Sequence, residues 1–142
     1  MKYFLTKDIK PIIQECFSSD KHFIEKCHRQ SGNGLDSCIN KTVEDLSAPD
    51  TSFYLVKTGK VNVGYFVIEK VDKYNVLLAF FIKPEYRKSK DVFWSLIEKA
   101  TDHSPFLCGV FNINPKAIKF LTDMGGTPAI KTNDGVVFRM GT

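Results

Sequence analysis

The sequence predicts a mixed α/β fold, and three observations lead to this prediction. Residues 53–82 contain three runs of strand character joined by short turns, which is typical of an antiparallel meander. The end of the third run, residues 76–82, is apolar on both faces and therefore suits a central strand covered on both sides. Beyond Pro84 the apolar period changes to that of helices. Strands flanked by helices indicate a mixed sheet with a covered centre.

The other elements follow from apolar periodicity and from turn residues. In chain order we expect a strand at 2–5, helices at 6–17, 19–29 and 36–46, strands at 53–57, 61–70 and 74–82, a helix at 89–100, a strand at 106–111, a helix at 115–124, and strands at 127–131 and 136–140. No linker, repeat or low-complexity tract interrupts residues 1–142, so we treat them as one domain.

Helix starts are predicted from capping residues. Thr6, Asp36 and Asn114 each precede a helical pattern and can accept a hydrogen bond from an amide of the first turn. Asn114 is the clearest case, because Pro115 follows at the first helical position and the Gly125-Gly126 pair ends the pattern.

Composition narrows the class of protein. The 142 residues carry a net charge of +4 and are 43% hydrophobic, so a real core is expected and the mild charge does not favour nucleic-acid binding. No apolar run is long enough for a membrane span, and the first residues do not resemble a signal peptide. We therefore expect a cytoplasmic protein that acts without a membrane.

Four cysteines raise the question of a metal site. Cys16, Cys27 and Cys38 are evenly spaced, with two histidines nearby. This spacing fits no structural zinc pattern, and the break at residues 32–34 interrupts any shared helix. The pattern favours reduced, half-buried thiols over zinc, and we expect no metal.

Two motifs resemble the GNAT (GCN5-related N-acetyltransferase) superfamily. Residues 84–92 read PEYRKSKDV, and their Pro84, Tyr86 and Arg87 match a family turn of the type Pro-x-Tyr-Arg-x-x-Gly-x-Gly/Ala. Residues 114–126 read NPKAIKFLTDMGG, and their Asn, first Ala and first Gly match Asn-x-x-Ala-x-x-x-Tyr-x-x-x-Gly-Phe. The resemblance implies the GNAT-like acyl-CoA N-acyltransferase fold, with a mostly antiparallel central sheet of about seven strands between helices.

The resemblance also implies a coenzyme site with acetyl-CoA as co-substrate. Relatives hold the pantetheine arm where two central strands part and hold the pyrophosphate at the start of the following helix, where unpaired amides and the helix dipole favour anions. The positions that would line the cofactor are Phe81, Ile82, Arg87, Lys88, Ser89, Lys90, Asp91, Val92 and Asn114.

Several positions depart from the family pattern. Lys90 and Val92 stand where glycines let the backbone approach phosphate, and Val92 is bulky enough to fill the phosphate seat. Asp91 places an acid among the amides expected to bind an anion. Leu121 stands where many relatives have a tyrosine that protonates the departing thiolate, and leucine has no proton to donate.

The function implied by the resemblance is acetyl transfer from acetyl-CoA to an amine of a small molecule or a protein. Glu69 or a water would take the proton from the amine, and residues 19–46 would form the acceptor side. The alternative is a GNAT-like binding or structural protein without catalysis. Small phage proteins of this kind, including internal virion components, also have a Phe-Leu pair in place of the tyrosine, so this alternative allows a virion location or a role in host interaction.

Overall fold

The computed structural model describes residues 1–31, 34–111 and 114–141. Gly32 and Asn33, part of the expected break, lie outside the described residues. The elements are β1 (Lys2–Thr6), α1 (Lys10–Ser18), α2 (Lys21–Ser31), α3 (Gly34–Asp45), β2 (Thr51–Thr58), β3 (Val61–Val71), β4 (Tyr74–Ile82), the 3-10 helix η1 (Pro84–Ser89), α4 (Lys90–Ala100), β5 (Phe106–Phe111), α5 (Pro115–Asp123), β6 (Thr127–Lys131) and β7 (Gly135–Met140).

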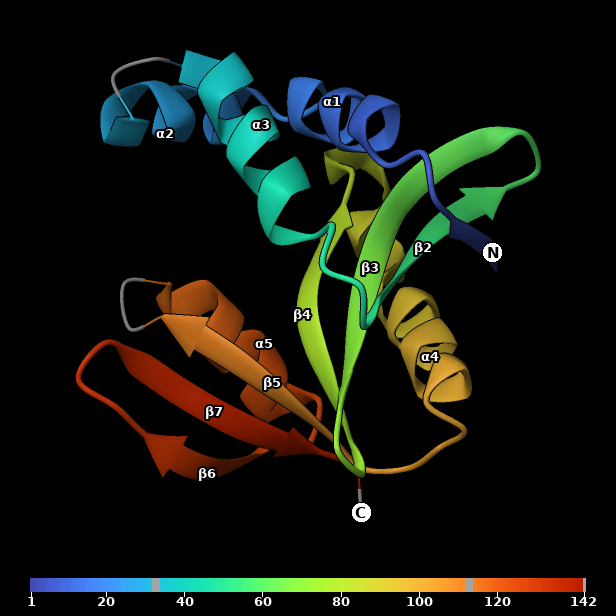
Figure 1. Cartoon of the computed structure of the whole chain (residues 1–142), viewed down its shortest axis with the longest axis vertical. Coiled ribbons are helices and arrows are strands. Elements are labelled where there is room, and N and C mark those ends of the chain that lie inside the picture. The colour runs from blue at the N-terminus through green and yellow to red at the C-terminus, as the bar shows by residue number, and fades with distance from the viewer. Residues whose placement is uncertain (32–33, 112–113, 142) are drawn as a thin grey trace.

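The strands form a single seven-stranded sheet in the order β1-β2-β3-β4-β5-β7-β6. All neighbouring strands are antiparallel except β4 and β5, which pair in parallel. The meander of β2, β3 and β4, the mixed sheet and the number of strands confirm the fold predicted from the sequence. Figure 1 shows β4 and β5 close together at one end and separating toward the other.

Two cores cover the two faces of the sheet. On one face, α1 and α3 pack through Ile13, Phe17 and Ile39 against residues such as Tyr65 of β3 and Phe81 of β4. On the other face, the core is built on α4, α5 and the aromatic side chains of the strands. Phenylalanine side chains therefore serve both cores, and the end of β4 at Phe81 and Ile82 is buried between them, whereas Leu78 is 39% exposed.

Helix boundaries differ from the sequence prediction at two of the expected caps. Thr6 ends β1 and does not cap α1, which begins at Lys10 after Ile9, a residue held in the core. Asp36 lies in the first turn of α3, because that helix already begins at Gly34. Asn114 caps α5 as predicted, and its Oδ1 accepts a hydrogen bond from the amide of Ala117 at 3.2 Å.

A cap that the sequence analysis missed begins α2. Asp20 Oδ1 accepts a hydrogen bond from the amide of Phe23 at 3.2 Å, which is the usual geometry of an aspartate at the N-cap. The second helix therefore starts after Asp20 rather than at Ser19. Asp20 is also almost completely buried, so it has a second role described below.

The cysteines do not gather at one place. Cys16 lies on the buried side of α1, whereas the Cys27 thiol shares a hydrogen bond with Cys38 between α2 and α3, and burial raises the pKa of Cys27 to about 12. Across residues 1–31, 34–111 and 114–141, no three His, Cys, Asp or Glu side chains are grouped as metal ligands would be. Within the same part of the chain, no helix is both long and apolar enough to cross a membrane.

Two strand glycines give opposite predictions for the fold. A Cβ at Gly64 would lie 1.9 Å from the carbonyl oxygen of Phe81, so Gly64→Ala should force β3 away from β4 and lower the free energy of unfolding by about 1–3 kcal/mol. A Cβ at Gly109 would meet no heavy atom within 4 Å, so Gly109→Ala should change it by less than about 0.5 kcal/mol. Urea unfolding of both variants measures the difference, and equal destabilisation would contradict this packing of β3 on β4.

Candidate coenzyme site between β4 and β5

The candidate site is a cavity of about 630 Å³ that opens where β4 and β5 part. The two strands pair at only three positions, Asn75 with Phe106, Val76 with Leu107 and Leu77 with Cys108. Beyond Leu77, the edge of β4 that faces β5 has no strand partner, and residues from Leu77 to Ile82 line the cavity. Backbone polar groups need partners when buried, so this edge can hydrogen-bond an amide-bearing ligand.

A β-bulge marks the position where the strands part. In the pairing of β3 with β4, Val67 faces Ala79 and Ile68 faces Leu77, so Leu78 is an extra residue without a partner on β3. A bulge bends its strand and re-aims the neighbouring groups. Leu78 is therefore displaced from the regular ladder on the β3 side and lies just beyond the last pair on the β5 side.

The charge of the cavity wall is positive. Its described lining includes three cationic side chains, Arg87, Lys90 and Lys116, and no carboxylate. The rest of the lining is mostly apolar, from β4, β5 and α5: Leu77, Leu78, Ala79, Phe80, Phe81, Ile82, Cys108, Gly109, Val110, Asn114, Ala117, Phe120 and Leu121. A ligand with an anionic group at one end and a less polar arm suits this arrangement.

Aromatic rings form the floor of the cavity on the α4 and α5 side. The ring of Phe120 lies 5.8 Å from that of Phe80 and 5.4 Å from that of Trp94, measured between centroids. The ammonium of Lys90 sits 5.4 Å from the centroid of Phe120, within the range of a cation–π contact. Lys90 is thus held at the cavity while its charge stays accessible.

The turn between β4 and α4 is helical, which changes the expected phosphate site. Residues Pro84–Ser89 form η1, which runs directly into α4 without a side-chain cap at Ser89. Backbone N–H groups inside a 3-10 helix bond to carbonyls three residues earlier, as the amide of Tyr86 does to Lys83 at 2.9 Å. Fewer amides are therefore open to an anion here than in a glycine-rich loop, and side-chain charge has to supply more of the attraction.

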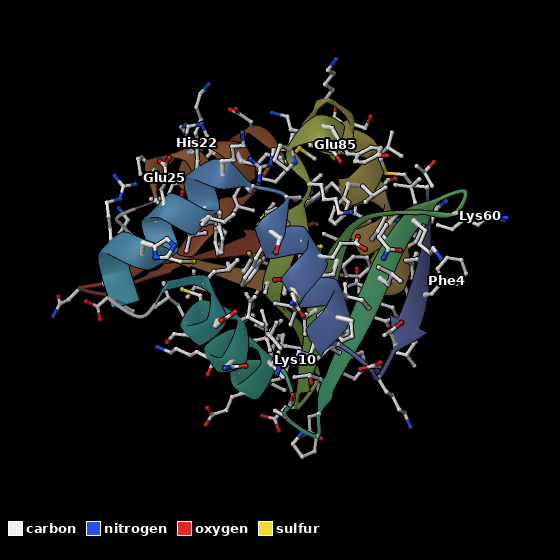
Figure 2. All side chains as sticks on the ribbon, turned by 90° about the horizontal axis from the view of Figure 1, so that it is seen from above. Phe4, Lys10, His22, Glu25, Lys60 and Glu85 are labelled. Carbon is white, nitrogen blue, oxygen red and sulfur yellow. The ribbon has the colours of Figure 1, made fainter. Side chains whose placement is uncertain are left out.

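Arg87 is held by three contacts. Its Nε donates to the carbonyl oxygen of Ile82 at 2.9 Å, its Nη2 pairs with Asp20 Oδ2 at 2.7 Å, and its guanidinium lies 5.6 Å from the ring centroid of Phe81. Figure 2, seen from above, places the start of α2 (at the labelled His22) and η1 (at the labelled Glu85) along the same edge of the molecule. Arg87 therefore links the β4–α4 turn to the α1–α2 connection.

The buried partner of this pair is Asp20. Burial acts to raise the pKa of its carboxyl, but the hydrogen bonds from Arg87 and from the amide of Phe23, together with the charge of Arg87, outweigh burial and hold the pKa below its ordinary value. A second ion pair, between Lys83 Nζ and Glu15 of α1, ties the end of β4 to the same helices. These two pairs fix the turn from the α1 side of the sheet.

The positions predicted to line the cofactor divide into two groups. Phe81, Ile82, Arg87, Lys90 and Asn114 line the cavity. Lys88, Ser89, Asp91 and Val92 lie in η1 and the first turn of α4 but are not among the lining residues. Val92 is 50% exposed, so its side chain does not fill the cavity as its place in the motif had suggested.

Other lining residues were not singled out from the sequence. Lys116 lies in the first turn of α5, and its position directly after Asn114-Pro115 was the signal that could have placed it near the opening. Phe80 was assigned to the core, and it does pack there, but it also lines the cavity. Gly109 is a lone glycine within a strand, a pattern that often marks close approach of a ligand.

The proposed acid and base positions lie apart from the cations. Leu121 lines the cavity and is almost completely buried, so this position offers no proton donor. Glu69 does not line it. Glu69 pairs across the strands with Val76, so its side chain projects on the face of the sheet covered by α1 and α3, two residues before the bulge at Leu78.

The structure resembles solved acetyltransferases over its whole length. An acetyltransferase from Thermus thermophilus superposes with a TM-score of 0.75 at 13% identity, covering 100% of this chain and 98% of that one. The PaiA N-acetyltransferase of Thermoplasma acidophilum, solved in complex with coenzyme A, gives 0.61 at 16% identity, with 100% of both chains covered. The Campylobacter jejuni N-acetyltransferase PseH, solved with acetyl coenzyme A, gives 0.56 at 13% identity, with 99% of both chains covered.

These similarities establish the GNAT fold that the two motifs suggested. Models of protein families give no match to the sequence, and curated protein sequences give none either. At 13–16% identity, what these comparisons show is the shared fold.

Removing the buried carboxylate tests the link between the turn and α2. Asp20→Asn should lower the free energy of unfolding at pH 7 by about 1 kcal/mol, a modest value because Arg87 is half exposed and screened by solvent. Because the pKa of folded Asp20 lies below the ordinary 3.8, its contribution is present above pH 3.8 and is lost as the pH falls through the lower folded value.

The measurement is urea unfolding of both proteins at neutral and at acid pH. The difference in free energy of unfolding between wild type and Asp20→Asn should become smaller at acid pH. Asp123→Asn is the matched control, since its pair with Lys119 is exposed and long at 3.9 Å, and it should have little effect. A difference in free energy of unfolding that stays constant with pH would contradict the pairing of Asp20 with Arg87.

Proposed function

We propose that this protein binds acetyl-CoA in the cavity between β4 and β5 and transfers the acetyl group to an amine. The observation that carries the proposal is the cavity itself, whose described lining combines an open β-strand edge, an aromatic floor and three cations without a carboxylate. The likeness in fold to proteins solved with coenzyme A and acetyl coenzyme A supports it.

The parted strand edge provides for the pantetheine arm. That arm carries amide groups, and residues 78–82 of β4 have no β5 partner on the cavity side. An extended arm can therefore hydrogen-bond β4 much as a strand would, since main-chain pairing on an open edge is a general mode of recognition. The bulge at Leu78 lies at the inner end of this edge, where the thioester carbonyl would meet backbone N–H groups that polarise it.

The phosphates of the coenzyme would meet Lys90 and Lys116 at the mouth of the cavity. Both side chains are exposed, and neither belongs to an ion pair among the described residues. Arg87 adds positive charge, but it already forms an ion pair with Asp20. Its main role is therefore to hold the turn between β4 and α4 rather than to bind a phosphate. Binding that depends on such side chains weakens as salt increases.

The transfer itself requires a neutral amine to attack the thioester. A carbon–nitrogen bond forms, the carbon–sulfur bond breaks, and the amine loses one proton. We assign that proton to Glu69, acting through a water molecule, since standard strand spacings put its Cα roughly 8 Å from that of Leu78. With leucine at position 121, the departing thiolate takes its proton from solvent.

Calorimetric titration with acetyl-CoA and with free coenzyme A tests the binding step. We expect micromolar affinity that falls as salt rises, and about three- to tenfold weaker binding in Lys90→Ala and in Lys116→Ala. Lys88→Ala is the matched control, since Lys88 belongs to the same turn but does not line the cavity, and it should bind like wild type. If folded protein gave no heat of binding at millimolar ligand, the proposed acetyl transfer would be excluded. The alternative, a GNAT-fold binding protein without catalysis, would remain.

The role of Glu69 is tested by the pH dependence of transfer. Glu69→Gln should lower kcat by about a hundredfold, because general base catalysis contributes a factor of that order, and should leave acetyl-CoA affinity unchanged because Glu69 lies outside the cavity. Glu85→Gln, an exposed change on η1 (labelled in Figure 2), is the control. If kcat were unchanged in Glu69→Gln, Glu69 would not be the base, and water alone would take the proton from the amine.

A further inference from the structure

A second cavity of about 410 Å³ adjoins the first. The two cavities share the lining residues Leu77, Leu78, Gly109 and Val110, which are the residues on either side of the point where β4 and β5 part. They therefore meet through the gap between these two strands.

The two cavities are covered by different elements. Residues of α4 and α5, among them Lys90 and Phe120, line the first cavity, and none lines the second. Instead the second is walled by β4, β5 and β7 and by the turn between β6 and β7. In Figure 1 this turn stands at the end of the β6–β7 hairpin, and α5 lies across β5 from it. A molecule in the second cavity thus approaches the gap from the side that the coenzyme leaves free.

The wall of the second cavity is apolar with a single charge. Its described lining is Val76, Leu77, Leu78, Leu107, Gly109, Val110, Thr132, Asp134, Gly135, Val136 and Val137. Asp134 is the only charged residue of this set, and it lies in the β6–β7 turn. The hydroxyl of Thr132 is already used within the same turn, where it accepts from the amide of Gly135 at 3.1 Å. The lining therefore favours a ligand that carries one positive group next to an apolar part.

Glu69 borders the same face. Val76 lines the second cavity, and Glu69 is its cross-strand partner on β3, so both side chains project toward that side of the sheet. A carboxylate beside the cavity can accept the proton that an ammonium loses before attack. Gly109 faces the gap, and the space where its side chain would stand is open, which keeps the passage between the cavities clear.

From these observations, and resting on the proposed acetyl transfer, we infer that the second cavity is the acceptor site and that the acceptor is a monocationic primary amine with an apolar substituent. The apolar substituent packs on the valine and leucine wall, and Asp134 attracts the ammonium as it enters. Glu69 removes one proton from the ammonium, and the neutral nitrogen then attacks the thioester carbon through the gap at Leu78 and Gly109. As the carbon–sulfur bond breaks, the second nitrogen proton passes through solvent to the departing thiolate. The products are the N-acetyl amide and the free thiol.

The same wall disfavours two other kinds of acceptor. A polyamine would place further positive charges against valine and leucine side chains, where burial of an unpaired charge is costly. A small hydroxylated amine would leave the apolar wall without contact. Each methylene buried against such a wall strengthens binding severalfold, so chain length is a sensitive readout.

The test compares acceptors by mass spectrometry of the acetylated product at saturating acetyl-CoA. We expect kcat/KM for hexylamine and for 2-phenylethylamine to exceed that for ethanolamine and for spermidine by about tenfold or more. Turnover that favours spermidine or ethanolamine would overturn the inference while leaving acetyl transfer in place. Absence of acetyl-CoA binding would overturn both proposals, so the two failures are distinguishable.

Two variants locate the acceptor on the structure. Val137→Phe fills the second cavity from a residue that does not line the first, and Asp134→Asn removes its charge. Each should raise the KM for hexylamine about tenfold while the Kd for acetyl-CoA stays within about twofold of wild type. Asp123→Asn, on the exposed side of α5, is the control for charge and should change neither constant. Unchanged KM in both cavity variants, with near-ultraviolet circular dichroism showing native packing, would rule out this cavity as the acceptor site.

Discussion

The parting of β4 and β5 is the constraint on which the rest of this structure depends. Parallel strands normally pair along their length, yet here the pairing of β4 with β5 ends after Leu77, next to the bulge of β4 at Leu78, while the other edge of β5 pairs with β7 along its whole length. Backbone groups left open in this way need a partner, and a sheet interrupted at its centre would otherwise be costly. The cavity, its open strand edge and the second cavity behind it all follow from this one interruption.

The interruption is supported from both faces. On the α4 and α5 side, the ring of Trp94 packs edge to face with those of Phe80 and Phe120, which are tilted against each other, so aromatic side chains fill the space beneath the opening. On the other side, Asp20 and Glu15 hold Arg87 and Lys83 at the end of β4. The cavity is therefore held open by two independent sets of contacts, one apolar and one ionic, and this favours a site already formed before a ligand enters.

In the turn between β4 and α4, Lys90 and Val92 stand where the family motif has glycines. A glycine-rich loop exposes amides, whereas η1 uses them within the 3-10 helix. The compensation is positive charge carried by Lys90 over Phe120 and by Lys116 at the start of α5. Val92 and Asp91, which looked unfavourable in the motif, stand outside the cavity, so neither opposes a ligand there directly.

The order of the elements, the central position of β4 and the Asn114 cap were determined by the sequence alone, because apolar periodicity and capping chemistry act between residues close in the chain. Local signals failed for Thr6 and Asp36, where burial of Ile9 and the earlier start of α3 at Gly34 decided the boundary. Residues of the site could be predicted only where they belong to one of the two family motifs. The motifs located Arg87, Lys90 and Asn114 but not Phe80, Lys116 or Gly109.

What only the tertiary structure decided is which distant residues meet. Asp20 and Arg87 are 67 positions apart, and no local sequence pattern predicts that they pair. Likewise Glu69 of β3 is not among the lining residues that carry the cations, and Asp134 lines the second cavity beside β4 and β5 only because β7 pairs with β5. The sequence specifies each strand and helix through short-range preferences, but the cavities lie between elements, so their shape and charge exist only once the strands have paired and parted.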